Sequence, residues 1–161
     1  MINPSYAASK TETINEDFIV EKIATNLMVS NMQESLAFYC DKLGFTLNMG
    51  VNSDHQTFTD GEPREDLIFA MLTLGDGELM LQRRDSLAQD VPVFSADATP
   101  GGTFTLYIRG TEVDTLAEQL GDSVEIIKGP ETSWYGMREL YIRDPDGYVL
   151  TLGTPDGPPP A

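Results

Sequence analysis

Residues 134–152, WYGMRELYIRDPDGYVLTL, form the stretch of sequence that decides the fold. The pattern is typical of two β-strands joined by a tight turn, Asp144-Pro145-Asp146-Gly147. In such a turn proline presets the backbone angle φ, and glycine adopts the left-handed conformation at the end. Aliphatic and aromatic residues on both sides of the turn favour strands. We expect this hairpin to form a rigid wall beside the aromatic pair Trp134-Tyr135 and to line the functional cleft.

The same order of elements occurs twice along the chain. The first copy has a strand at 23–29, a helix capped by Ser30-Asn31 and ended by Gly44, and strands at 45–51, 67–74 and 78–82. The second copy has a strand at 103–109, a helix capped by Thr111 and ended by Gly121, and strands at 124–127, 137–143 and 148–152. An internal repeat of this kind dictates the architecture. We predict an α+β fold of two tandem βαβββ modules, whose curved mixed sheets surround a cleft.

The boundaries of these modules follow from composition. A polar stretch, 1–17, predicts a flexible arm, and the Pro/Gly-rich stretch 154–161 predicts a disordered tail. The domain between them, 18–153, divides into module one at 18–83, a connector at 84–102 and module two at 103–153. The connector carries Pro92, Pro100 and Gly101-Gly102, which predict irregular structure. We also expect loops at 52–66 and 129–133.

Composition excludes several classes of function. The 161 residues carry a formal charge of −16, and phosphate backbones need a basic surface, so nucleic acid is not an expected partner. An acidic surface attracts cationic ligands. No apolar run approaches the roughly 20 residues of a membrane span, and residues 1–15 lack the pattern of a signal peptide, so we expect a cytoplasmic protein without membrane contact.

The chain offers no recognisable catalytic group. Cys40 is the only cysteine, which excludes an internal disulfide, and it lies on a predicted helix. A catalytic cysteine would need a histidine nearby, whereas the only one, His55, lies in a polar loop. No glycine-rich phosphate loop follows a strand. We therefore predict no catalytic residues.

Two segments carry a resemblance to a known family. SLAFYCDKLGF at 35–45 and the hairpin segment at 134–152 resemble the hallmark segments of the vicinal oxygen chelate superfamily. This group includes glyoxalase I, extradiol dioxygenases, and fosfomycin and bleomycin resistance proteins. The resemblance extends over about 20–153 and implies the two-module fold. It does not by itself imply one activity, because this fold serves several chemistries.

In the metal-dependent members, His, Gln or Glu side chains from the first and last strands of each module hold a divalent ion. The resemblance places these positions at Ala24, Met80, Thr103 and Thr151. None offers the nitrogen or carboxylate donor that such an ion needs. A shift of register by two would bring in Glu78 and Gln82, which still leaves too few donors. We expect no functional metal and no cofactor.

The missing ligands, the acidity and the pattern W-x-G-x-R-E at 134–139 are closest to the metal-free bleomycin-resistance-like members. That resemblance implies an acidic homodimer that sequesters a small ligand, cationic or aromatic and antibiotic-like, without a metal. The alternative is a glyoxalase-like or dioxygenase-like metalloenzyme whose metal site is displaced. The predicted ligand-binding residues are Trp134, Tyr107, Phe58, Phe69, Arg138, Glu139 and Gln82, and the aromatic residues considered for the lining also include Phe38 and Tyr39.

Overall fold

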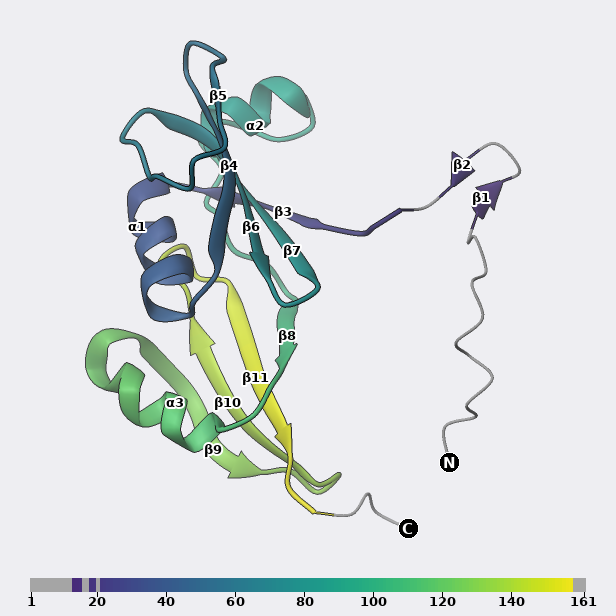
Figure 1. Cartoon of the computed structure of the whole chain (residues 1–161), viewed down its shortest axis with the longest axis vertical. Coiled ribbons are helices and arrows are strands. Elements are labelled where there is room, and N and C mark those ends of the chain that lie inside the picture. Colours follow the sequence, from purple (N-terminus) through teal and green to yellow (C-terminus); the bar gives the residue numbers. More distant parts are fainter. Residues whose placement is uncertain (1–12, 16–17, 20, 158–161) are drawn as a thin grey trace.

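The computed structural model describes residues 13–15, 18–19 and 21–157, with side chains described from residue 21 onward (Figure 1). Parts of the predicted arm (1–12 and 16–17) and of the predicted tail (158–161) lie outside the described residues. β1 (Thr13–Asn15) and β2 (Phe18–Ile19) form a small two-stranded sheet that Figure 1 places away from the two larger sheets.

Two mixed sheets make up the body of the molecule, and each has the topology of one predicted module. The first sheet has the order β3-β7-β6-β4-β5, and the second has the order β8-β11-β10-β9. In both, the first strand of the module pairs parallel with the last, and the other pairings are antiparallel. The first sheet contains β3 (Thr25–Val29), β4 (Thr46–Asn52), β5 (Thr57–Phe58), β6 (Leu67–Leu74) and β7 (Gly77–Arg83), and the second contains β8 (Thr105–Arg109), β9 (Glu125–Thr132), β10 (Met137–Arg143) and β11 (Val149–Pro155). The predicted α+β fold of two βαβββ modules is confirmed.

One hydrophobic core serves both modules. α1 (Met32–Leu36) and α3 (Val113–Leu120) lie on the same side of the sheets in Figure 1. Buried side chains from both helices and from the strand residues that face them belong to one cluster. Leu81 of module one and Leu150 of module two are each fully buried in it. Each sheet therefore has a helix face toward the core and an opposite face, which we call the open face.

The predicted hairpin turn also joins the two modules. Asp144 accepts hydrogen bonds from the backbone N–H groups of Asp146 and Tyr148, as a tight turn requires. The same carboxylate accepts a hydrogen bond from the Tyr39 hydroxyl of module one, at 2.8 Å between oxygens. The Tyr148 hydroxyl donates to the Met28 carbonyl oxygen at 3.0 Å. Two buried hydrogen bonds therefore connect the turn of module two to module one.

The helix of module one starts as predicted but changes its geometry. The Asn31 side chain accepts hydrogen bonds from Gln33 and Glu34 at the N-terminus, which confirms the predicted cap. After one turn the α-helix widens into a π-helix, η2 (Ala37–Lys42). Gly44, at φ 79°, ends this helical segment as predicted.

Four predicted local structures are wrong. The predicted loop at 52–66 contains the short strand β5, which pairs with β4, because threonine and phenylalanine favour strands. The connector contains a helix, α2 (Arg84–Asp90), because Pro92, Pro100 and the glycines all follow it and leave its own residues free to form turns. β9 continues to Thr132 through the predicted loop at 129–133, since Gly129, at φ 86°, fits a register shift opposite β10. The residue before α3 is Glu112 in a left-handed conformation, so Thr111 is not its cap. A 3₁₀ turn, η3 (Gly121–Ser123), follows α3.

None of the helices in the described part of the chain combines the length and the apolar character that a membrane-spanning helix requires.

Candidate functional site

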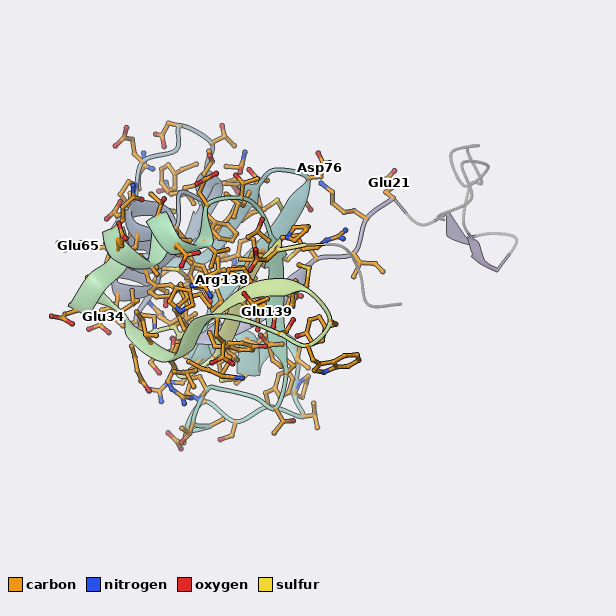
Figure 2. All side chains as sticks on the ribbon, turned by 90° about the horizontal axis from the view of Figure 1, so that it is seen from below. Glu21, Glu34, Glu65, Asp76, Arg138 and Glu139 are labelled. Atoms are coloured by element: carbon orange, nitrogen blue, oxygen red, sulfur yellow. The ribbon has the colours of Figure 1, made fainter. Side chains whose placement is uncertain are left out.

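A carboxylate surrounded by three tyrosines occupies the open face of module two. Glu139 of β10 is 2% exposed and accepts hydrogen bonds from the hydroxyl groups of Tyr107, Tyr135 and Tyr141. The oxygen–oxygen distances are 2.6, 2.6 and 2.9 Å respectively. Tyr107 comes from β8, Tyr135 from the β9–β10 turn and Tyr141 from β10. We call these four residues the Glu139 cluster (Glu139 is labelled in Figure 2).

Strand alternation places this cluster on the open face. Leu140 and Ile142 are fully buried on the helix face of β10. Their neighbours Glu139 and Tyr141 therefore point to the opposite face. Tyr107 lies on the same face, because Thr151 of β11 is directly opposite both Tyr107 and Tyr141 in the strand register.

A glycine allows Tyr107 to reach Glu139 across the intervening strand. Gly153 of β11 is directly opposite Glu139 of β10. A Cβ atom at Gly153 would lie only 2.4 Å from the Tyr107 hydroxyl oxygen. Any side chain at this position would therefore displace the tyrosine.

The hydrogen bonds decide the charge of Glu139. Burial alone would raise the pKa of this carboxyl group, but the bonds donated by the three tyrosines outweigh burial, and the pKa is lowered. The carboxylate is therefore ionised at neutral pH. Burial and the bond to Glu139 raise the pKa of Tyr107 to about 12. The pKa of Tyr141 is raised mainly by its own bond to Glu139, so both phenols keep their protons at neutral pH.

Exposed aromatic surface adjoins the cluster. Trp134, which is 85% exposed, meets the edge of Tyr135 with ring centroids 5.3 Å apart. The ammonium group of Lys128 lies 5.6 Å from the Tyr141 ring centroid and pairs with Glu131 at 2.6 Å. The surface therefore combines a free indole face, phenol groups and a buried negative charge.

A pocket between the modules shares one lining residue, Tyr107, with the Glu139 cluster. It has a volume of about 380 Å³ and lies between the β6–β7 turn and β8, with Tyr107 in its lining. Buried apolar side chains, among them Phe45 and Leu79, line it. Asp76 and Glu78 also line the pocket. We call this cavity the seam pocket.

Of the residues predicted from the sequence, the structure brings Trp134, Tyr107 and Glu139 together. Arg138, the neighbour of Glu139, points to the helix face and pairs with Asp114 of α3 at 2.7 Å (both Arg138 and Glu139 are labelled in Figure 2). Its guanidinium group therefore lies on the other side of the sheet from the Glu139 cluster.

The other predicted residues belong to module one. Gln82 and Phe69 are directly opposite each other on β7 and β6. The Gln82 amide is occupied, because its oxygen accepts from Asn26 and its nitrogen donates to Ser86 and Asp90 of α2. Phe58 packs against the core, with the Arg64 guanidinium 3.8 Å from its ring centroid.

Phe38 and Tyr39, which the sequence also suggested for the lining, are core residues. Phe38 is 4% exposed and Tyr39 is fully buried. Both rings pack edge-on within the aromatic group at the end of the first helix.

The positions that hold a metal in related folds do not fit a divalent ion here. Met80 is opposite Asn26, and the Thr151 hydroxyl is bonded to the Thr105 hydroxyl at 2.7 Å. Ala24 and Thr103 supply no ligand of the required kind. His55 is exposed in the loop between β4 and β5. Within residues 21–157 no three His, Cys, Asp or Glu side chains gather in a group that could hold a metal ion.

Two partners of Glu139, Tyr135 and Tyr141, are not among the residues predicted from the sequence to bind a ligand. A signal was present for Tyr141, because the pattern Glu-x-Tyr on a strand places both side chains on one face. The contribution of Tyr135 depends on the shape of the β9–β10 turn, for which the sequence has no comparable pattern.

The fold and the sequence define the class of this protein. Residues 21–152 match the model of the Glyoxalase/Bleomycin resistance protein/Dioxygenase superfamily, and the chain belongs to this family. No curated protein matches the chain.

Solved structures share the fold at low sequence identity. A protein of unknown function from Agrobacterium tumefaciens is 22% identical, with a TM-score of 0.65 over 87% of this chain and 98% of that one. A glyoxalase/bleomycin resistance protein/dioxygenase from Nocardioides is 21% identical, with a TM-score of 0.62 over 98% and 93%. An antibiotic binding protein from a Streptomyces species is 22% identical, with a TM-score of 0.57 over 86% and 98%.

Proposed function

We propose that this protein binds a small molecule with cationic and aromatic character, without a metal, at the open face of module two. The observation that carries the proposal is the Glu139 cluster with exposed Trp134 beside it. An ionised carboxylate held beneath phenol rings creates a negative potential at an accessible aromatic surface. An indole face stacks on flat rings and attracts cations, at about 0.5–2 kcal/mol per good contact.

Three further features support this function. The net charge of −16 attracts cations, and Figure 2 shows labelled acids on two sides of the molecule, with Glu34 and Glu65 on one side and Asp76 on the other. The seam pocket, at about 380 Å³, has the size of a small-molecule site and lies beside Tyr107. A protein that binds an antibiotic has the same fold, which supports the proposal that the ligand of this chain is antibiotic-like.

The test is a titration with bleomycin in metal-free buffer, followed by the fluorescence of Trp134, the only tryptophan. We expect a saturable change at micromolar ligand. In calorimetry, Trp134→Ala should weaken binding about tenfold or more, as expected for an aromatic anchor. The matched control is Phe94→Ala, because Phe94 is also exposed, at 48%, but lies in the connector. Equal affinities of Trp134→Ala and wild type would remove Trp134 from the site.

The alternative function is a metalloenzyme of the same superfamily with a displaced metal site. It requires three or four donors around one ion, and the described residues bring no such set together. Elemental analysis of protein purified without chelators should find much less than one zinc, nickel, iron or manganese per chain. A stoichiometric metal would favour the enzyme.

We also propose that the protein is a homodimer. Each module has an open sheet face, and Ile127 on the edge strand β9 is 43% exposed in addition to Trp134. A symmetric dimer is the commonest assembly that covers such surfaces. Light scattering at micromolar concentration should give twice the chain mass, and a monomer mass would contradict the proposal.

A further inference from the structure

We propose that the Glu139 cluster selects ligands that donate hydrogen bonds, such as primary ammonium, amidinium or guanidinium groups, over quaternary ammonium groups and anions. This inference rests on the proposed function and specifies its ligand class. It assigns Glu139 the role of a positioning residue that orients the phenols and does not itself touch the ligand.

The selectivity follows from where the phenol protons are. An ionised carboxylate can only accept hydrogen bonds, and each tyrosine hydroxyl has one proton to donate. All three phenols donate that proton to Glu139, over distances of 2.6, 2.6 and 2.9 Å. Their oxygens are therefore left with lone pairs only, and an incoming group must supply the hydrogen.

The exposed fractions of the side chains show which residues of the cluster a ligand meets. Glu139 is 2% exposed, whereas Tyr107 is 44% and Tyr135 is 38% exposed. A ligand on the open face thus contacts the phenols and not the carboxylate beneath them. Three oriented acceptors favour an N–H cation and disfavour a carboxylate or phosphate, which would bring lone pairs against lone pairs.

A cation of the protein itself already lies at this surface. The ammonium group of Lys128, an N–H donor, lies 5.6 Å from the Tyr141 ring centroid. Lys128 is also directly opposite Tyr141 in the strand register, and its charge is shared with Glu131. Among residues 21–157 no lysine or arginine lies over the ring of Tyr135, or over the ring of Trp134 beside the cluster. No cation of the described chain therefore competes with a ligand ammonium for the faces of these two rings.

The inference can be tested with three probes that share one ring: benzylammonium, benzyltrimethylammonium and phenylacetate. Binding is followed by the chemical shifts of backbone amides at the cluster in NMR titrations of the full chain. We expect benzylammonium to bind about tenfold more tightly than the trimethyl analogue, since a hydrogen bond from a charged donor has an effect of this order. Phenylacetate should give no saturable shifts.

Two variants connect this preference to the cluster. Glu139→Gln keeps the size of the side chain, but the new amide group donates a hydrogen bond to one phenol oxygen. The hydroxyl group of that phenol then rotates, and its proton is no longer donated to residue 139. In this variant the preference for benzylammonium over benzyltrimethylammonium should fall to about twofold or less. Tyr107→Phe, at an exposed position, removes one acceptor while keeping the ring, and should reduce the preference without abolishing it. The control is Glu125→Gln, which removes the same charge from an exposed residue paired with Arg143 and should keep the full preference.

Each outcome decides between the claims. A preference that is lost in Glu139→Gln and kept in Glu125→Gln supports the inference. Equal binding of both cations to the wild type overturns donor selection and leaves the proposed binding function standing. If no probe gives saturable shifts at the cluster, both the inference and the proposed function fail.

Discussion

The substitution Gly153→Ala isolates the contact on which the Glu139 cluster depends. The new methyl group would lie 2.4 Å from the Tyr107 hydroxyl oxygen, far inside van der Waals contact, so the tyrosine must swing away. Glu139 then loses one of its three hydrogen bonds. Gly153 has no left-handed backbone, so the substitution introduces no strain in the main chain.

The size of the effect follows from two opposing contributions. A hydrogen bond to a charged group contributes about 1.5–3 kcal/mol, and the lower end applies because water can replace the half-exposed phenol. Alanine also restricts the unfolded chain, which raises the free energy of unfolding by about 0.4–1 kcal/mol. We therefore expect the free energy of unfolding to fall by about 1 kcal/mol. Because Tyr107 loses its carboxylate neighbour, its pKa should also return from about 12 toward the ordinary value of 10.0.

Urea denaturation measures the first effect, and a spectrophotometric titration of the tyrosines measures the second. The control is Gly110→Ala, just beyond the end of β8, where an added Cβ meets no atom within 4 Å. Because alanine restricts the unfolded chain here too, this variant should gain about 0.4–1 kcal/mol in the free energy of unfolding, and it should keep the raised pKa of Tyr107. If Gly153→Ala keeps both the wild-type stability and the raised pKa of Tyr107, then the hydroxyl does not depend on the space at Gly153, and our account of the cluster is wrong.

Two other predictions concern charge and burial. Because the pKa of Glu139 is lowered on folding, its ionised form stabilises the fold above the ordinary carboxyl value of 4.5, and this contribution is lost as pH falls through the lowered pKa. The stability advantage of wild type over Glu139→Gln should therefore shrink on acidification in urea titrations, and an advantage that is constant with pH would contradict the assignment. Tyr39→Phe removes the hydroxyl group that donates a hydrogen bond from module one to Asp144 of module two. Asp144 is only 5% exposed, so water cannot easily replace this bond. We expect a loss of about 1–3 kcal/mol in the same assay, and wild-type stability would mean that the contact contributes nothing.

The sequence predicts the repeated architecture well because local rules govern it. The Asp144-Pro145-Asp146-Gly147 turn, the Asn31 cap and the alternation in β10 each depend on residues close together in the chain. The helix α2 was not predicted, because the composition of the whole connector indicates irregular structure. Seven of its residues contain neither Pro nor Gly, and these residues form the helix.

The candidate site was predictable only in part. Trp134, Tyr107 and Glu139 could be selected by residue type, but their meeting depends on the register of β8, β11 and β10. That register decides that Gly153 lies beside Glu139 and that Tyr107 can pass over it. Arg138 and Phe58 have suitable chemistry for a binding surface, but each points to the helix face of its sheet.

The hydrogen bond between Tyr39 and Asp144 has a consequence for how this sequence can change over time. The two residues are 105 positions apart, one in each repeat, and each satisfies the other's buried polar group. A substitution in one repeat therefore alters the cost of a substitution in the other. The two halves of the chain resemble independent copies in their topology, but at this contact they evolve as a pair, and related sequences should keep or replace both residues together.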